Sequence, residues 1–375
     1  MTTSTTSAPR LSQRQLNRAL LERQLLLRRH SMSIPEAIER LVGLQSQVPD
    51  PPYIGLWTRL HDFDPLELSD LMVKRQVARV TVMRGTIHLL TCRDAVAIRA
   101  VMQPSLTRQI QGSRFIWPKV ADMDVHELRQ TAHRILREEP LTIKQLATRL
   151  VEHWPERDGM AMAQVVRSVL PLVQVPPRGL WRANGPSAWA PLEDWLGTPI
   201  HDEPAVDDFI VRYLRAFGPA SNADLQKWSG LSGMRPHLER LRPHLRVYRD
   251  PAGRELFDVP AGPIPDEDTP APVRLLPKFD NAILSHADRT RITAKEDWPK
   301  IGTVNGLIAA TVLVDGYVRG TWDIVDDRDG AAVEVTPFID LTADQEDEIA
   351  REARSVLAFA VPDARRHDVR ILPKR

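Results

Sequence analysis

The sequence predicts an α+β protein in which three tandem winged-helix units precede a β-rich C-terminal module. Two observations predict this fold class. An amphipathic helical pattern followed by a short two-stranded pattern occurs three times, which is the order of elements in a winged helix. A proline-rich, acidic stretch then separates these repeats from a mainly β pattern. The expected divisions are a disordered tail (1–10), three winged-helix units (11–122, 123–200 and 201–260), a linker (261–272) and the C-terminal module with a final helix (273–375).

The first unit is predicted from capping signals and from a change of hydrophobic period. Ser12 and Ser33 are each followed three residues later by Gln or Glu, the pattern of a capping box, and they open the helices "RQLNRALLERQLLLRR" and "IPEAIERLVGL". A third helix is expected in "DPLELSDLMVKRQ". The period then falls from 3.6 to 2 in "VARVTVM" and "TIHLLT", which indicates two strands joined at Arg84 and Gly85.

The later units follow the same order. "VHELRQTAHRILREEPLTIKQLATRL" predicts helix, turn and helix, and "GLWRANGPSAWA" predicts a wing around Asn184 and Gly185. The third unit runs from "AVDDFIVRYLRAFGPASNADLQKWSGL" to a hairpin in "LRVYRDPAGRELFDV". In the C-terminal module, the Asp-Gly pair of "TVLVDGYVRGTW" predicts a tight hairpin, and Thr342 caps the final helix.

Charge is segregated along the chain although its net value is only +1. Residues 71–121 hold nine Lys or Arg and one acid, whereas residues 323–350 hold ten acids and one Arg. Of the 50 basic residues 42 are Arg, whose planar fork suits phosphate, although a coding bias explains such an excess equally well. The basic stretch should therefore attract polyanions, whereas the acidic stretch should repel them. A further basic run lies near the start, at Arg14, Arg18, Arg23, Arg28 and Arg29.

Several classes of protein are excluded. Cys92 is the single cysteine, so an internal disulfide and a cysteine-based zinc site are excluded, and a reducing cytoplasm is expected. The polar start lacks a secretory signal, and no apolar run reaches the ~18 residues of a membrane helix. The motifs GxxxxGK[ST], GxGxxG, HExxH and GxSxG are absent. We therefore expect no metal and no cofactor.

One short stretch, "LQSQVPDPP", carries the strongest candidate for catalysis. The prolines bias this stretch toward an extended backbone, in which residues two apart point the same way. Gln45 and Gln47 are therefore expected to direct both amides at one place, with Ser46 between them. The alternative is that the amides only cap the preceding helix and satisfy the backbone of the loop.

Four separated motifs are similar to those of a known family. "LVGLQSQVPDPPYIGLWTRL", "VMRGTIHLL", "LLPKFDNAILSHADR" and "VLVDGYVRGTW" resemble the bacterial winged-helix DNA glycosylases of the AlkZ type, over about residues 10–373. The resemblance implies three winged helices and a β-rich region in a C-shape around double-stranded DNA. It implies a catalytic Gln-x-Gln pair at Gln45 and Gln47. Ser46 departs from the aliphatic or Ala residue often found between them, which leaves pocket details open.

The implied activity is hydrolysis of the N-glycosidic bond of cationic N7-alkylated purines, including bulky adducts and interstrand cross-links. The protein is expected to act as a monomer in DNA repair or in self-resistance to a DNA-alkylating antibiotic. Contacts to phosphate should make its binding to DNA strongly salt-dependent. Two rivals remain open: a winged-helix transcription regulator without catalysis, and a protein that shields adducts without cutting them.

Other residues are weaker candidates for DNA binding or for lining the site. Arg84, Thr86 and His88 belong to the first hairpin, although His88 is equally well explained as a packed strand residue. In "FDNAILSHADR", the polar residues either join the C-terminal module to the winged helices or face DNA. They are Asp280, His286, Asp288 and Arg289.

Overall fold

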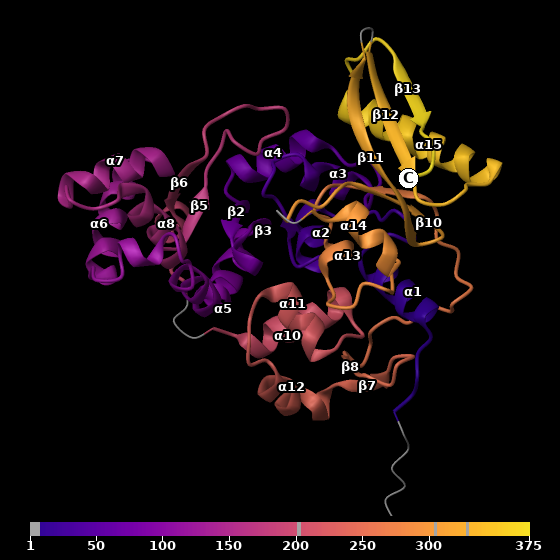
Figure 1. Cartoon of the computed structure of the whole chain (residues 1–375), viewed down its shortest axis with the longest axis horizontal. Coiled ribbons are helices and arrows are strands. Elements are labelled where there is room, and N and C mark those ends of the chain that lie inside the picture. Colours follow the sequence, from indigo (N-terminus) through magenta and orange to yellow (C-terminus); the bar gives the residue numbers. More distant parts are fainter. Residues whose placement is uncertain (1–7, 201–203, 304–305, 328–329) are drawn as a thin grey trace, which may run out of the picture.

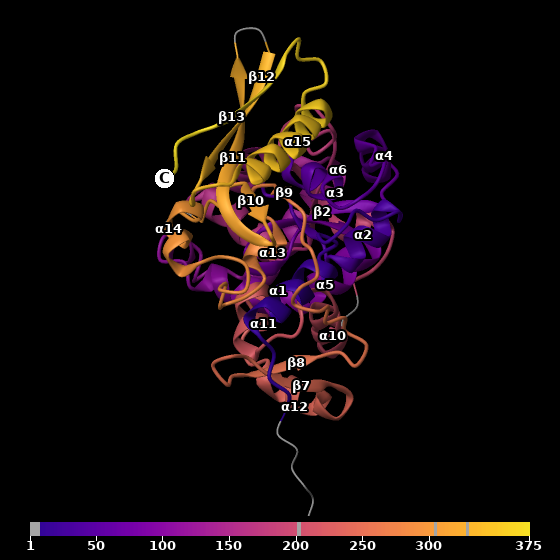
Figure 2. The same cartoon turned by 90° about the vertical axis from the view of Figure 1, so that its right-hand side faces the viewer.

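The protein has a mixed α+β fold, as predicted. The computed structural model describes residues 8–200, 204–303, 306–327 and 330–375 (Figure 1). The second unit, the third unit and the C-terminal sheet lie on three sides of the first unit, as Figures 1 and 2 show. None of the helices in these described ranges has the length and apolar character needed to cross a membrane.

The first unit contains the expected helices and hairpin, although its first helix ends at Arg23 instead of continuing to Arg29, because Leu25 has a positive φ of 59°. It also contains two α-helices and a strand that the sequence analysis missed. Capping boxes at Ser12 and Ser33 begin its first two helices. The missed elements are a two-residue strand, a helix that starts at two prolines, and a 20-residue helix after the hairpin. Asp50, expected to be extended, is helical (φ −76°, ψ −34°). The elements are α1 (Gln13–Arg23), α2 (Ile34–Arg40), β1 (Leu44–Gln45), α3 (Pro51–Trp57), α4 (Pro65–Val73), β2 (Val77–Thr81), η1 (Met83–Gly85), β3 (Ile87–Thr91), α5 (Cys92–Gln111) and η2 (Trp117–Lys119).

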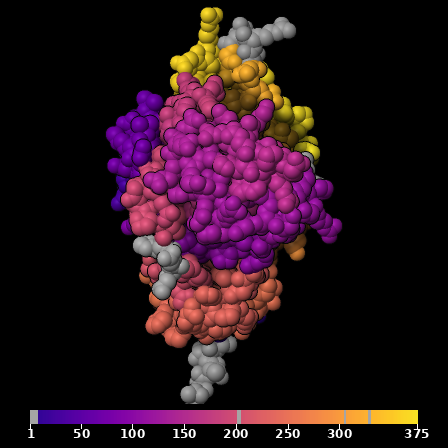
Figure 3. Space-filling view, turned by 90° about the vertical axis from the view of Figure 1, so that its left-hand side faces the viewer, coloured from indigo at the N-terminus to yellow at the C-terminus, as the bar shows by residue number. Residues whose placement is uncertain are grey.

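The strands of the first and second units form one sheet. Arg79 and Val80 of β2 pair with Gln174 and Val173 of β5, which gives six strands in the order β1-β3-β2-β5-β6-β4. The helices of the second unit cover one side of the molecule (Figure 3). The second unit comprises α6 (Val125–Glu138), β4 (Leu141–Thr142), α7 (Ile143–His153), α8 (Gly159–Val169), β5 (Leu172–Gln174), β6 (Ala188–Pro191) and α9 (Leu192–Leu196).

The third unit is three helices followed by a separate two-stranded hairpin, which is the predicted order. Arg10 pairs with Arg249 of this hairpin, so part of the predicted N-terminal tail runs along it, whereas residues 1–7 lie outside the described residues. Residues 201–203, placed at the start of this unit, also lie outside them. The elements are α10 (Val206–Phe217), α11 (Asn222–Ser229), α12 (Arg235–Leu241), η3 (Arg242–His244), β7 (Arg246–Arg249) and β8 (Glu255–Asp258).

The C-terminal module is a five-stranded sheet covered by a long helix. Its order is β13-β12-β11-β10-β9, and the predicted Asp315 and Gly316 turn joins β10 to β11 with positive φ at both residues. Thr342 caps the last helix, as expected, whereas the final strand, which runs parallel to β12, was not predicted. The elements are β9 (Arg274–Leu276), α13 (Asn281–Leu284), η4 (Lys295–Asp297), α14 (Trp298–Ile301), β10 (Thr311–Val314), β11 (Tyr317–Asp327), β12 (Gly330–Pro337), α15 (Ala343–Ala360) and β13 (His367–Ile371).

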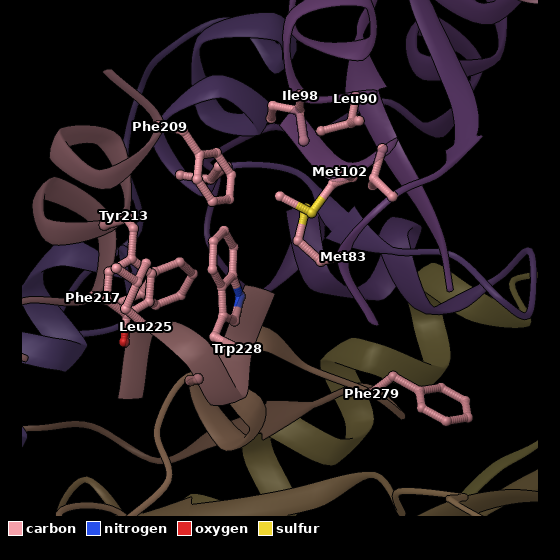
Figure 4. Close-up of a cluster of buried hydrophobic side chains, with 14 of the residues drawn as sticks. Met83, Leu90, Ile98, Met102, Phe209, Tyr213, Phe217, Leu225, Trp228 and Phe279 are labelled. Carbon is pink, nitrogen blue, oxygen red and sulfur yellow. The ribbon is translucent and has the colours of Figure 1, made fainter. Parts of the chain in front are cut away.

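One apolar core connects the first unit, the third unit and the C-terminal module. Trp228 stacks on Phe209 with ring centroids 5.5 Å apart, and it contacts Tyr213 and Phe217 at 5.0 Å each. Figure 4 shows these rings beside Met83 and Met102 of the first unit. Because burial of apolar surface is the main favourable term in folding, this shared core holds the units in fixed relative positions.

Buried ion pairs cross the same boundaries. Arg23 of α1 donates to Asp258 of β8 at 2.6 and 2.7 Å, and both side chains are 1% exposed. Arg59 donates to Asp280 in the C-terminal module at 2.8 and 2.9 Å. These ion pairs fix the position of the first unit relative to the third unit and to the C-terminal module.

Candidate active site

The glutamine stretch is held at the edge of the six-stranded sheet. Two residues with positive φ, Val42 (54°) and Gly43 (82°), turn the chain out of α2. A Cβ on Gly43 would lie 2.4 Å from the Leu90 side chain, so the close approach to β3 requires glycine. β1 then pairs with β3, with Gln45 opposite His88, and the Ser46 N–H continues the ladder to the Ile87 carbonyl (2.7 Å).

Gln45 is the last residue of β1 and Gln47 lies just beyond the strand, so the common orientation of the two amides stays a prediction. Ser46 is buried and fixed by Arg79, whose Nε donates to the Ser46 hydroxyl (2.9 Å) and whose Nη2 donates to its carbonyl (2.7 Å). Burial lowers the pKa of Arg79 to about 10. Arg79 was not a sequence candidate, and its place within an apolar strand was the signal that pointed to a polar partner.

Gln45 is 7% exposed, and its amide is oriented by Arg84. Arg84 Nη2 donates to Gln45 Oε1 at 2.8 Å, and Nη1 donates to the Trp228 carbonyl of α11. Among the described residues no carboxylate lies within ion-pair distance of Arg84. Burial and the neighbouring Arg289 lower the pKa of Arg84 to about 10. The amide oxygen of Gln45 therefore accepts from a guanidinium that has no carboxylate partner among the described residues.

Gln47 is exposed, and its Oε1 accepts from the Ile87 N–H at 3.2 Å. This contact is of the kind that the alternative interpretation expected, an amide that satisfies loop backbone. Each amide oxygen has two lone pairs, so one on each glutamine stays available. Within the described ranges neither amide nitrogen has a hydrogen-bond partner.

His88 is fully buried directly beside Gln45. Its Nδ1 lies 3.1 Å from the Thr86 carbonyl, and its Nε2 has no partner among the described residues. Burial, with the Arg84 charge next, lowers its pKa to about 3, so the imidazole is neutral at physiological pH. Thr86 donates its hydroxyl to the Met83 carbonyl (3.1 Å) and so stabilises the hairpin turn.

The polar cluster of the C-terminal module divides between two places. The charge of Arg289 lowers the pKa of Arg84, and its side chain donates to the Ile283 carbonyl at 3.2 Å and lies over the Trp298 ring at 3.9 Å. His286 is 2% exposed, with its ring nitrogens 2.8 Å from Ser285 Oγ and 3.1 Å from the Phe217 carbonyl. Hydrogen bonds from Thr290, and then the ion pair with Arg254, lower the pKa of Asp288 to about 2. His286 and Asp288 therefore join the C-terminal module to the third unit and do not line the site.

Asn281, which follows Asp280 in this segment, supports the glutamine stretch, a role that sequence reasoning missed. Asn281 Nδ2 donates to the Gly43 carbonyl at 2.6 Å. A narrow cavity of about 10 Å³ adjoins Gln45 and is lined by residues that include Arg59, Asp280 and Asn281. Within the described ranges, no three His, Cys, Asp or Glu residues gather as a metal site would require.

Comparison with known proteins identifies the family of this chain. The family model of the AlkZ-like DNA glycosylases matches residues 38–359. The interstrand DNA cross-link repair glycosylase of Streptomyces sahachiroi is 27% identical over 353 residues, which cover 85% of this chain and 89% of that protein. The solved structure of Streptomyces sahachiroi DNA glycosylase AlkZ shares the fold, with a TM-score of 0.78 at 24% identity, over 97% of this chain and 100% of that one. The chain belongs to the AlkZ-like DNA glycosylase family.

Proposed function

We propose that this glycosylase hydrolyses the N-glycosidic bond of cationic N7-alkylated purines in double-stranded DNA. The substrates include bulky adducts and interstrand cross-links, and the name of the Streptomyces relative supports the cross-links. The enzyme is monofunctional and acts as a monomer whose units curve around the duplex. Its role is DNA repair or self-resistance to an alkylating antibiotic.

The charge of the lesion explains why neutral side chains suffice. The C1′–N9 bond breaks with its electron pair passing to the cationic base, which leaves without being protonated. A water oxygen bonds to C1′ and its proton passes to solvent, so the products are the free alkylated base and an abasic site. The protein must position that water and stabilise the oxocarbenium-like sugar, which an amide oxygen does through its lone pair and dipole.

One observation carries this proposal: the amide oxygens of Gln45 and Gln47 both accept hydrogen bonds from the β2–β3 hairpin, from Arg84 Nη2 and from the Ile87 N–H. A neutral amide is a very weak proton acceptor and activates water only slightly. It is therefore too weak to drive the release of uncharged nucleobases, which leave less readily than cationic ones. The enzyme should therefore act on cationic lesions and leave neutral damaged bases in place.

The test is release of N7-methylguanine from a defined duplex, with abasic sites revealed by alkali. The wild type should cleave, and the Gln45→Ala/Gln47→Ala variant should lose at least about 100-fold in rate, the scale of removing an oriented transition-state dipole. Gln111→Ala, at an exposed glutamine of α5, is the matched control and should keep full activity.

Two results would contradict the proposal. Unchanged cleavage by the double variant would remove the glutamines from the reaction. Binding of the duplex by the wild type without cleavage would favour a transcription regulator or an adduct-shielding protein instead.

A further inference from the structure

An exposed aromatic ring stands on the loop that follows α5. Phe115 is 86% exposed, the highest value among the large apolar side chains of the described residues, and the next value is 63% at Leu66. A phenylalanine ring in water is unfavourable for the free protein, and a ring this exposed adds little to the core. Its placement is therefore explained better by contact with a partner than by folding.

The loop holds this ring in a fixed place. Ile110 before it and Val120 after it are buried in the apolar core of the second unit. Ile116 and Trp117, the two residues directly after the ring, pack against the same core. Within the loop, the Ile116 N–H donates to the Ser113 hydroxyl at 3.3 Å, and the Trp117 N–H donates to the Ser113 carbonyl at 3.1 Å. Because its neighbours are anchored, a partner that binds the ring need not order the loop, which lowers the entropy cost of the contact.

The same core connects the loop to the glutamine site. It includes Ile87 of β3, whose backbone N–H donates to the Gln47 amide oxygen at 3.2 Å. In the last turn of α5, Gln109 lies against the turn of the β2–β3 hairpin, since a Cβ on Gly85 would be 2.5 Å from Gln109 Oε1. The ring therefore stands beside the hairpin that orients both glutamines, on the side of the second unit.

The chain around the ring is basic. Residues 105–121 contain Arg108, Arg114 and Lys119 and no acid. Lys119 donates to Asp158 at 2.6 Å. Arg114, next to the ring, is exposed and has no carboxylate partner among the described residues. A guanidinium available to phosphate, beside a ring available to bases, matches a duplex, which carries its charge on the backbone and stacks its bases within.

We propose that Phe115 inserts between base pairs of duplex DNA beside the lesion, while Arg114 binds the adjoining backbone phosphate. Apolar side chains that enter a base step unstack it and kink the duplex. The kink opens the deoxyribose of the lesion toward Gln45 and Gln47 without rotating a bulky base out of the helix. The inference rests on the proposed function, because it takes the lesion to lie at the glutamines, and it makes Phe115 a positioning residue.

The first test measures stacking without catalysis. The Gln45→Ala/Gln47→Ala variant is added to a duplex that carries N7-methylguanine with 2-aminopurine as the neighbouring base, on each side in turn. The fluorescence of 2-aminopurine is quenched by stacking, and it should rise about twofold or more at one of the two positions. Adding Phe115→Ala to this variant should remove the rise, and adding Phe115→Trp should keep it. Leu66→Ala is the matched control, because Leu66 is an exposed apolar side chain on α4, and it should keep the rise.

The second test measures turnover with both glutamines in place. Phe115→Ala should lower kcat/KM for release of N7-methylguanine at least about tenfold, the scale of one lost stack between a base and an aromatic ring. Its unfolding temperature should equal that of the wild type, because the ring adds little to the core, so misfolding does not explain the loss. Phe115→Trp should keep most of the rate. Arg114→Ala should lower the slope of log affinity against log salt concentration by about one, as the loss of one phosphate contact requires.

The outcomes separate this inference from the proposed function. If Phe115→Ala keeps either the fluorescence rise or the wild-type rate, the inference is wrong. A changed sedimentation of the free Phe115→Ala protein, with its rate and the fluorescence rise unaltered, would assign the ring to contact between copies of the chain. If the glutamine variant raises the fluorescence but the wild type releases no base, the proposed function fails and the insertion stands. Release of the base without any rise would overturn the insertion alone.

Discussion

At the scale of single residues, the notable feature is a cation that has no carboxylate partner among the described residues and lies against a catalytic candidate. Arg84 has positive φ (56°), reaches Gln45 with one nitrogen and the Trp228 carbonyl with another, and is partly buried. A charged hydrogen bond of this kind contributes about 1.5–3 kcal/mol. Its effect here is to fix the amide of Gln45, so Arg84 is a positioning residue.

Replacing Arg84 tests that role. Arg84→Lys keeps the charge but cannot reach Gln45 and Trp228 together, and we expect kcat to fall about 10- to 100-fold with a smaller change in KM. In a Gln45→Ala background the same replacement should have little further effect, since the group it positions is gone. Single-turnover rates for the four proteins of the cycle measure the coupling. Additive losses would show that Arg84 acts independently of Gln45.

Two buried histidines make stability depend on pH. His88 and His286 have pKa values lowered to about 3, mainly by burial, whereas in the unfolded chain they titrate near 6.5. The unfolded state therefore binds protons first as pH falls, so stability is full above about pH 6.5 and is lost toward pH 3. Denaturant titrations should give an unfolding free energy about 2 kcal/mol lower at pH 5.5 than at pH 7. A flat or opposite dependence would contradict the buried, neutral state of these rings.

The sequence predicts a common orientation of Gln45 and Gln47 from the alternation of an extended chain, which is a local property, and this stays a prediction. It did not predict the partners of charged residues, which depend on distant contacts. Arg18 and Arg23, counted as part of a basic run, are 0% and 1% exposed and pair with Asp315 and Asp258. Arg79 and Arg99, counted within the basic stretch 71–121, are also buried. Charge counted along the sequence therefore overstated the surface available to DNA.

At the scale of elements, the turn of the first hairpin is held between two other elements. A Cβ on Gly85 would lie 2.5 Å from Gln109 Oε1 of α5, and one on Gly230 would lie 3.2 Å from the Arg84 Cα. Ser105 of α5 donates to the Gly230 carbonyl at 2.7 Å. The end of α11 thus sets the position of Arg84, although it belongs to a different unit from the glutamines.

A glycine pair tests this contact. Gly230 and Gly233 both have positive φ, 80° and 72°, but a Cβ on Gly233 meets nothing within 4 Å. Gly233→Ala should lose only the backbone cost, about 1 kcal/mol, without a change in rate. In Gly230→Ala the added Cβ also crowds the Arg84 backbone, and this should lower kcat several-fold. Thermal unfolding and single-turnover rates separate the two effects, and equal behaviour of both variants would disprove the contact.

Elements with strong local signals were predicted, and those set by long-range contacts were not. The capping boxes at Ser12 and Ser33 and the Asp-Gly turn at Asp315 were confirmed, because each is encoded within a few residues. α5 was missed: Pro104 lies inside it, and proline usually signals a helix end. β1 has only two residues, and pairing with β3 rather than local propensity defines it.

At the scale of the whole molecule, buried ion pairs join parts of the chain that are far apart in sequence. Arg23 and Asp258 are 235 residues apart and both almost fully enclosed. Neutralising one partner leaves the other charge buried without compensation, which typically costs about 3–5 kcal/mol. The N-terminal helix is therefore part of the scaffold that holds the third unit.

The prediction is that Asp258→Asn lowers the free energy of unfolding by about 3 kcal/mol or more. Asp70→Asn, which breaks the exposed Lys74–Asp70 pair, should leave the denaturation midpoint unchanged. Denaturant titrations of both variants make the comparison. Similar midpoints for the two would mean that the enclosed pair contributes no more than a surface one.

The hydrogen-bonded ladder between β2 and β5 also determines how this protein can be divided. A fragment that stops at residue 122 would leave the β2 edge with unpaired N–H and C=O groups, which invites self-association. The first two units are therefore not structurally independent of each other. Chimaeras made from relatives should exchange them as one block, with crossovers placed beyond residue 200.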